Sequence, residues 1–257
     1  MEHGVLEVCV DSVESAIAAY QGGADRIELC GDLAVGGVTP SLILFRRIRE
    51  YTDLKIRVLL RPRFGDFCYS SYEREQMREE AQQFAEMGAD AIVTGVLRPD
   101  GSLDTEEIRT LLVCAGDAGI ALHRAFDMCE NPLEALEQVC SLGVKTILTS
   151  GQRNSAWEGR ALLKELQEKS RGRVEILAGA GVESQNIEPL YRETGITSYH
   201  MSGKVKKESL MQFRNPQVSM GFPGFSEYEI WQTSEQLIRE AAQVLRELSG
   251  ENDLPLP

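Results

Sequence analysis

Short runs of β-branched and other aliphatic residues alternate with longer amphipathic stretches along most of the chain. The short runs predict strands at residues 5–10, 26–30, 56–61, 90–94, 120–124, 145–149, 174–178 and 197–201. Apolar residues at helical spacing predict helices between them at 12–22, 40–51, 71–87, 104–118, 131–142, 155–169 and 183–193, and a last helix at 226–249. Such alternation is typical of an open doubly wound sheet or of a closed barrel.

An internal repeat favours the barrel. A glycine stands where a helix should end just before each even-numbered strand, at Gly23, Gly88, Gly143 and Gly195. This spacing suggests a strand–helix–strand–helix unit used four times. We therefore predict an α/β fold, a (β/α)8 TIM-type barrel that forms a single domain over residues 1–250 with a C-terminal helix. Residues 251–257 are predicted to be a disordered tail, and 62–72 and 204–225 to be long loops.

Composition and charge narrow the classes of function. The 257 residues are 42% hydrophobic and 26% charged, as in an ordinary globular protein with a large core. A net charge of −13 repels nucleic-acid phosphates and anionic lipid, so we expect neither partner. The chain has no apolar run long enough to span a membrane and no basic segment followed by an apolar stretch at its start, so we expect a cytoplasmic protein.

Polar residues occupy one face of several predicted strands. Because side chains alternate along a strand, the apolar set Leu6, Val8 and Val10 should pack against the helices. The opposite set should point into the barrel and gather towards one mouth: Glu7, Cys9, Glu28, Cys30, Arg61, His123, His200 and Ser202. Catalytic groups of such barrels come from the carboxyl ends of the strands. The same charges could instead form a buried network that locks the barrel.

Two smaller signals concern ligands. Glycine-rich backbone after two strands, around Gly179, Gly181 and Ser202, with Ser150 nearby, could present N–H groups to a phosphate. Cys9 and Cys30 lie at matching positions on neighbouring strands about 4.8 Å apart. The two thiolates could share one soft ion such as Cu(I), or they could be small core residues.

Several longer motifs carry a family resemblance. Glu7-Val8-Cys9-Val10-Asp11-Ser12, Gly36-Gly37-Val38-Thr39-Pro40-Ser41, Arg61-Pro62-Arg63 with Gly65-Asp66-Phe67, and His123-Arg124-Ala125-Phe126-Asp127 resemble the CutC family. The resemblance runs in order from about residue 5 to 221. It implies a cytoplasmic TIM-type barrel with a role in copper homeostasis and copper binding, and it matches the family's copper-linked cysteines to Cys9 and Cys30. The matched motifs add Asp127 to the catalytic candidates and Arg63 and Asp66 to the ligand-binding candidates. His200, at the end of a predicted strand, is a further ligand-binding candidate.

Three hypotheses about function follow, and the sequence does not decide whether the chain is an enzyme. The first is a copper-binding homeostasis protein. The second is an enzyme acting on a small phosphorylated or carboxylated metabolite, with Glu7 or Glu28 as general base, His123 as acid or electrophile, and Arg61 holding the anion. The third is a scaffold that self-associates through Trp231 and the final helix. We expect a homo-oligomer whose partner is a small-molecule anion or a copper ion.

Overall fold

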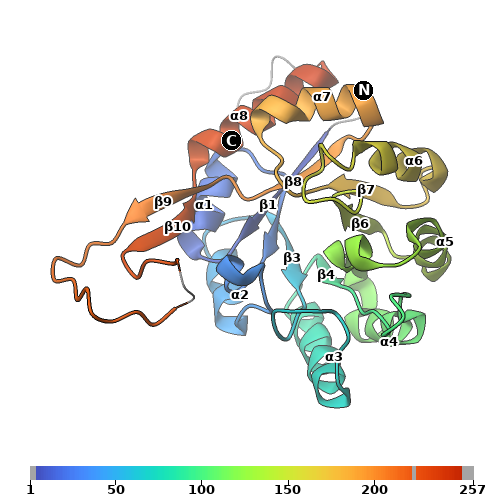
Figure 1. Ribbon diagram of the computed structural model, residues 1–257, viewed down its shortest axis with the longest axis horizontal. Helices are drawn as coiled ribbons and strands as arrows, with labels where there is room; N and C mark the ends of the chain where they lie inside the picture. The colour runs from blue at the N-terminus through green and yellow to red at the C-terminus, as the bar shows by residue number, and fades with distance from the viewer. Residues whose placement is uncertain (1–3, 222–223, 251–257) are drawn as a thin grey trace.

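Eight parallel strands close into a barrel in the computed structural model, which describes residues 4–221 and 224–250. Each strand pairs with the next one in the chain, and the last pairs with the first (Figure 1). The strands are β1 (Val5–Val10), β2 (Arg26–Leu29), β3 (Lys55–Leu59), β4 (Ala91–Thr94), β5 (Ile120–Leu122), β6 (Thr146–Thr149), β7 (Glu175–Ala178) and β8 (Ser198–Met201). The predicted (β/α)8 barrel is confirmed, and the predicted tail at 251–257 lies outside the described residues.

Helices surround the barrel. They are α1 (Val13–Gln21), α2 (Leu42–Arg49), α3 (Ser71–Glu86), α4 (Thr105–Ala115), α5 (Pro132–Leu142), α6 (Arg160–Ser170), α7 (Ser184–Thr194) and α8 (Glu235–Ser249). The four glycines of the predicted repeat follow the last turns of α1, α3, α5 and α7 with φ between 71° and 87°, a conformation that suits glycine. Within the described residues, none of the helices has the length and apolarity needed to cross a membrane.

The strand alternation read from the sequence separates two apolar regions. Leu6, Val8 and Val10 are fully buried in the large core between the barrel and the helices. A much smaller cluster inside the barrel holds Cys9, Cys30, Leu59, Val93 and Ala121. The barrel interior is therefore only partly apolar, and the remaining space is left to polar side chains.

The segment after β8 differs from the prediction. Residues expected as a loop begin with β9 (Lys204–Glu208), which pairs antiparallel with β10 (Glu229–Thr233). The last helix begins at Glu235 rather than at residue 226, because Ser234 caps it and the preceding Glu-Ile-Trp-Gln-Thr run favours a strand. We call residues 204–221 with 224–233 the arm, which projects away from the barrel (Figure 1).

Helix α8 turns its apolar stripe towards its own barrel. Ile238, Ala241 and Leu245 are buried in the large core. Helix α8 packs beside α7, which precedes it in the barrel, and beside α1, the first helix of the chain. The stripe is therefore an intramolecular contact, and it does not supply the subunit contact that was one expectation for this helix.

Candidate functional site

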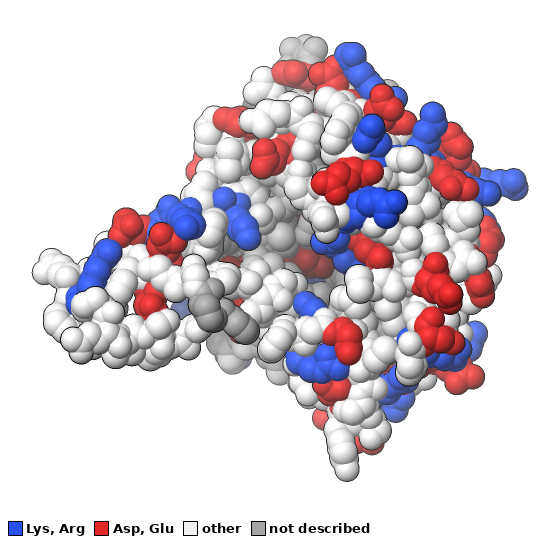
Figure 2. Space-filling view, in the orientation of Figure 1, with Lys and Arg blue, Asp and Glu red and all other residues white. Residues whose placement is uncertain are grey.

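A chamber of about 630 Å³ opens at the carboxyl ends of the strands. Its polar lining includes Cys9, Glu28, Arg61, His123, Arg124, His200, Ser202 and Lys204. The corresponding face of the molecule is hollowed near its centre (Figure 2). This volume lies in the range of typical small-molecule sites.

His200 from β8 and Glu28 from β2 form the floor of the chamber. His200 Nδ1 lies 2.9 Å from Glu7 Oε1, and its Nε2 lies 3.7 Å from Glu28 Oε2. Burial would lower the pKa of His200, but the neighbouring Cys9 sulfur, Glu7 and Glu28 raise it well above its ordinary value. Burial raises the pKa of Glu28, with His200 opposing that effect. The floor thus holds a carboxylate and a charged imidazole side by side, a base and an acid in one site.

Glu7 lies beneath this floor and does not line the chamber. Its carboxylate meets Arg26 Nε at 2.5 Å and Arg57 Nη1 at 3.2 Å, and both arginines also pair with Glu175. Although burial opposes ionisation, the hydrogen bond from His200 and the charge of Arg26 lower the pKa of Glu7 to about 2. The structure therefore places Glu7 in a buried charge network, which was the alternative expectation for the inward-facing charges.

Only one of the two candidate metal ligands reaches the chamber. Cys9 lines it and directs its thiol towards the Met201 carbonyl at 3.6 Å, whereas Cys30 points its thiol at Glu28 Oε2 at 3.5 Å and does not line the chamber. Burial and the nearby Glu28 raise the pKa of Cys30 well above its ordinary value. Among residues 4–221 and 224–250, no cluster of three or more His, Cys, Asp or Glu side chains is arranged to hold a metal ion.

Arg61 forms part of the chamber wall, and the loops after β2 and β3 hold it in place. Its Nη1 donates to the carbonyls of Gly36 and Gly37 at 3.3 and 3.1 Å, and its Nη2 donates to Gly65 at 2.7 Å. The guanidinium lies 5.0 Å from the Phe67 ring, whose other neighbour is the His123 ring at 4.9 Å. The wall is therefore a stack of a fixed cation, an aromatic ring and an imidazole.

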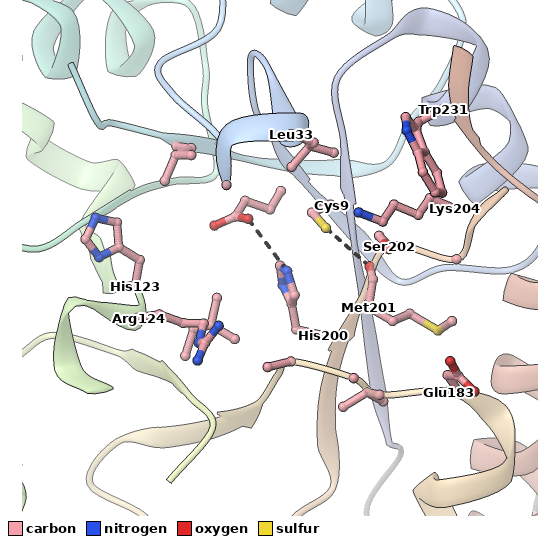
Figure 3. A pocket seen from close by; sticks show the side chains of 18 of the residues that line it. Cys9, Leu33, His123, Arg124, Glu183, His200, Met201, Ser202, Lys204 and Trp231 are labelled. Carbon is pink, nitrogen blue, oxygen red and sulfur yellow. Dashed lines mark hydrogen bonds and ion pairs between the residues drawn. The ribbon is translucent and has the colours of Figure 1, made fainter. Parts of the chain in front are cut away.

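His123 directly follows β5 and lines the chamber, where it lies apart from His200 (Figure 3). The Ala125 N–H donates to His123 Nδ1 at 3.1 Å, so the proton of the neutral ring is on Nε2. Burial and the nearby Arg61 lower the pKa of His123 to about 3. Its Nε2 is buried and has no hydrogen-bond partner within the part of the chain that the structure describes. His123 is thus a neutral donor without an acceptor.

Asp127 and Ser150 stand beside the chamber and organise its rim. Asp127 accepts from the Ser150 N–H and hydroxyl, from the Gln152 N–H and from Arg124 Nε at 2.7 Å. Ser150 in turn accepts from Arg124 Nη2 at 2.9 Å. Neither Asp127 nor Ser150 lines the chamber, but both fix Arg124, which does.

The remaining predicted ligand-binding residues divide between the rim and the exterior. Gly181 and Ser202 line the chamber, whereas Gly179 lies against the Leu148 side chain outside the lining. Arg63 and Asp66 pair with each other at 3.0 Å on the loop after β3 and do not line the chamber. The structure therefore brings Gly181 and Ser202 to the site and leaves the other three away from it.

Arg124, Lys204 and Trp231 are among the lining residues that were not site candidates from the sequence. Arg124 lies inside the His123–Asp127 motif, so its position next to a strand end was a usable signal. Lys204 and Trp231 come from the arm, with Lys204 Nζ 5.0 Å from the indole ring (Figure 3). The missed hairpin hid both from sequence reasoning, because only the β9–β10 pairing brings Trp231 back to the mouth.

Fold and site together define a (β/α)8 barrel protein with a polar chamber at the carboxyl ends of its strands. A model of the CutC family matches residues 4–205. The family protein CutC of Bacteroides fragilis is 43% identical over 231 residues, covering 89% of this chain and 92% of its own. The human copper homeostasis protein cutC homolog is 40% identical over 236 residues, covering 91% and 86%. The chain belongs to the CutC family.

Solved structures agree with this assignment. The CutC structure from Streptococcus agalactiae superposes with a TM-score of 0.74 at 30% identity, covering 77% of this chain and 98% of its own. The phosphoribosylanthranilate isomerase of Pyrococcus furiosus superposes with a TM-score of 0.55 at 14% identity, covering 95% and 100%. The second likeness concerns the barrel fold alone.

Proposed function

We propose that the chamber binds a small phosphorylated or carboxylated metabolite and performs acid–base chemistry on it. The observation that supports this most is the His200–Glu28 pair in a chamber whose lining also holds His123 and Arg61. A buried carboxylate and imidazole held as an ion pair are costly in a barrel unless they are used or fully paired. The Nε2–Oε2 separation of 3.7 Å leaves both atoms able to meet a ligand.

Basic side chains at the mouth favour an anionic ligand. Arg61, Arg124 and Lys204 all line the chamber, although the chain as a whole carries a net charge of −13. Local positive charge within an acidic surface draws a small anion to this mouth. The carboxylate of Glu28 would then act as the base, and the charged His200 beside it would act as the acid.

Ligand-induced thermal stabilisation tests this proposal. Inorganic phosphate, 3-phosphoglycerate and pyruvate are added separately, since a ligand at about 100 times its Kd stabilises by about 2.7 kcal/mol. We expect at least one of these anions to raise Tm, and we expect Lys204→Gln to weaken the effect. Lys207→Gln on the same strand is the matched control, because Lys207 does not line the chamber. No rise with any of the three anions would refute the proposal.

Copper binding is the second candidate function. The human relative carries the name copper homeostasis protein, and Cys9 and Cys30 belong to the same small cluster inside the barrel. Two thiolates suit Cu(I), and the reducing cytoplasm that we propose as the compartment would keep both sulfurs available. Because Cys30 must lose a proton against its raised pKa, Cu(I) affinity should increase with pH.

A competition titration tests the copper proposal. Purified protein is titrated anaerobically with Cu(I) against a strong chelator, and the Cys9→Ser/Cys30→Ser double variant is compared with the unaltered chain. Equal affinity of the two proteins would end the proposal. Met201 is a weak candidate for a third sulfur, because its side chain extends away from Cys9 (Figure 3).

We also propose that two copies of the chain associate through the arm. Its large apolar side chains are exposed: Leu210 is 98% exposed, Met220 85% and Phe213 76%. The first strand of the arm also carries Lys206 and Lys207, which do not line the chamber and complement the acidic body of a second copy. Sedimentation velocity should show a dimer that Phe213→Asp dissociates. Tyr72→Asp, at an 82% exposed site on α3, is the control, and a monomeric unaltered chain would refute the proposal.

A further inference from the structure

The unpartnered donor on His123 indicates what kind of group the chamber receives. Its Nε2–H is buried, with the whole residue only 5% exposed, and it has no acceptor among the residues that the structure describes. A buried donor left without an acceptor destabilises the protein as long as the site is empty. The ring lines the chamber, and a small rearrangement of the neighbouring wall would let a ligand oxygen reach this donor and supply the missing acceptor.

The surroundings of the ring fix both its orientation and its tautomer. The Ala125 N–H occupies Nδ1 at 3.1 Å, and the Phe67 ring packs against one face. Gly95, just after β4, lets the imidazole sit against the backbone, because an added Cβ would stand 2.9 Å from Nδ1 and Cε1. The donor is therefore held in place before any ligand arrives.

A neutral donor suits an oxygen that becomes charged during a reaction. A fixed N–H gains most from an acceptor whose negative charge develops in the transition state, and it needs no proton transfer to do so. Arg61 stands on the other side of Phe67 and adds a positive field that stabilises the same charge. His200 and Glu28 line the same chamber, where Glu28 offers a base to the carbon next to the oxygen-bearing carbon.

We propose that the chamber enolises a carbonyl compound, with His123 as the catalytic donor to the carbonyl oxygen and Glu28 as the base. This inference rests on the proposed function and names its substrate class: a small aldehyde, ketone or 2-oxo acid that carries an anionic group. Glu28 takes the proton from the carbon next to the carbonyl. The C–H electron pair forms the new C=C bond, and the C=O π pair moves to the oxygen as an enolate that His123 and Arg61 stabilise.

The step is complete without an oxidant or reductant. Glu28 is protonated at this stage. It returns the proton to the same carbon, to the neighbouring carbon or to the oxygen, and His200 then balances the charge of the carboxylate that is formed again. Returning it to the neighbouring carbon of a hydroxy carbonyl compound, with proton movement between the oxygens, gives an isomer. Returning it to the same carbon exchanges the hydrogen there with solvent or inverts the configuration of that carbon. Deuterium uptake from solvent reports either outcome.

Hydrogen exchange measured by proton NMR tests the inference. Pyruvate and dihydroxyacetone phosphate are incubated in deuterated buffer with the unaltered chain, with His123→Gln and with Glu28→Gln. We expect the unaltered chain to exchange the proton next to the carbonyl of at least one compound. Each variant should reduce that rate by about 100-fold or more, the loss that follows removal of one such donor or base. No exchange above the His123→Gln rate with either compound would overturn the inference.

A second measurement separates this inference from the proposed function. The chain has three histidines, so the imidazole signals in a nitrogen–proton correlation spectrum can be assigned with single variants. Oxalate, a planar mimic of the enolate of pyruvate, should shift the His123 Nε2–H signal in the unaltered chain. If oxalate raises Tm but leaves that signal unchanged, the inference fails and the proposed function stands. If neither oxalate nor the earlier anions raise Tm, both fail.

Discussion

Replacing Glu7 by glutamine removes one buried charge and keeps the shape of the side chain. The Glu7 side chain is 2% exposed and accepts from Arg26, lies 3.2 Å from Arg57 and binds His200 Nδ1 at 2.9 Å. Glutamine can keep some of these hydrogen bonds, but it leaves Arg26 and Arg57 with Glu175 as the remaining carboxylate of the network. The variant therefore measures the charge itself.

The size of the effect follows from the pKa of Glu7. The pKa falls from 4.5 in an unfolded chain to about 2 in the folded protein. At about 1.4 kcal/mol for each pH unit, this difference corresponds to about 3 kcal/mol of stability at neutral pH. Loss of one partner from a buried ion pair costs a similar amount, about 3–5 kcal/mol. For a chain of this size, about 3 kcal/mol lowers Tm by about 6–12 °C.

The effect has a defined pH dependence. Because the folded pKa is the lower one, the stabilisation is fully present above about pH 4.5 and disappears as the pH falls towards 2. Calorimetry of Glu7→Gln and the unaltered chain at several pH values should therefore show a gap in Tm that closes in acid. A gap that stays constant from neutral pH to acid would refute the charge argument, and so would a gap of less than about 2 °C at neutral pH.

A matched control is available at the surface. Glu137 also pairs with an arginine, meeting both terminal nitrogens of Arg173 at 2.7 and 2.6 Å, but it is exposed to solvent. Surface ion pairs contribute little because water screens them. Glu137→Gln should leave Tm nearly unchanged, so that a large effect at Glu7 can be attributed to burial.

Three further predictions concern the chamber and its supports. In a nitrogen NMR titration, His123 should stay neutral down to about pH 3, while His200 should stay charged well above pH 6.5. Gly95→Ala should reduce turnover or ligand response by displacing the His123 ring, whereas Gly221→Ala, with open space around it, should not; equal effects would contradict this. Ser70→Ala removes the capping box of α3 and should cost about 1 kcal/mol in urea unfolding.

Much of the fold could be predicted because it depends on local patterns. The alternation of strands and helices, and glycines such as Gly143 and Gly195 at helix ends, reflect backbone requirements that act within a few residues. The arm was missed for the opposite reason. Its strands pair across a gap of about twenty residues, and a short run such as Glu229–Thr233 gives little evidence of its partner.

The sequence could predict which side chains point into the barrel, but not how close each one lies to the mouth. Alternation along a strand shows which side chains point inward, and it placed Glu28, Arg61 and His200 correctly in the barrel. It does not show their height along the barrel axis, because that depends on the stagger between strands. Glu7 and His200 are register partners on β1 and β8, yet only His200 reaches the chamber.

The structure also shows why the two expectations for the inward-facing charges are not exclusive. Glu7 belongs to the buried network with Arg26 and Arg57, and the same carboxylate holds Nδ1 of His200. Because Nδ1 is engaged below the floor, Nε2 is the atom that His200 presents to Glu28 and to the chamber. A carboxylate that fixes an imidazole in this way sets both its orientation and its charge. The network that stabilises the lower part of the barrel therefore also positions the group that we propose for proton transfer above it.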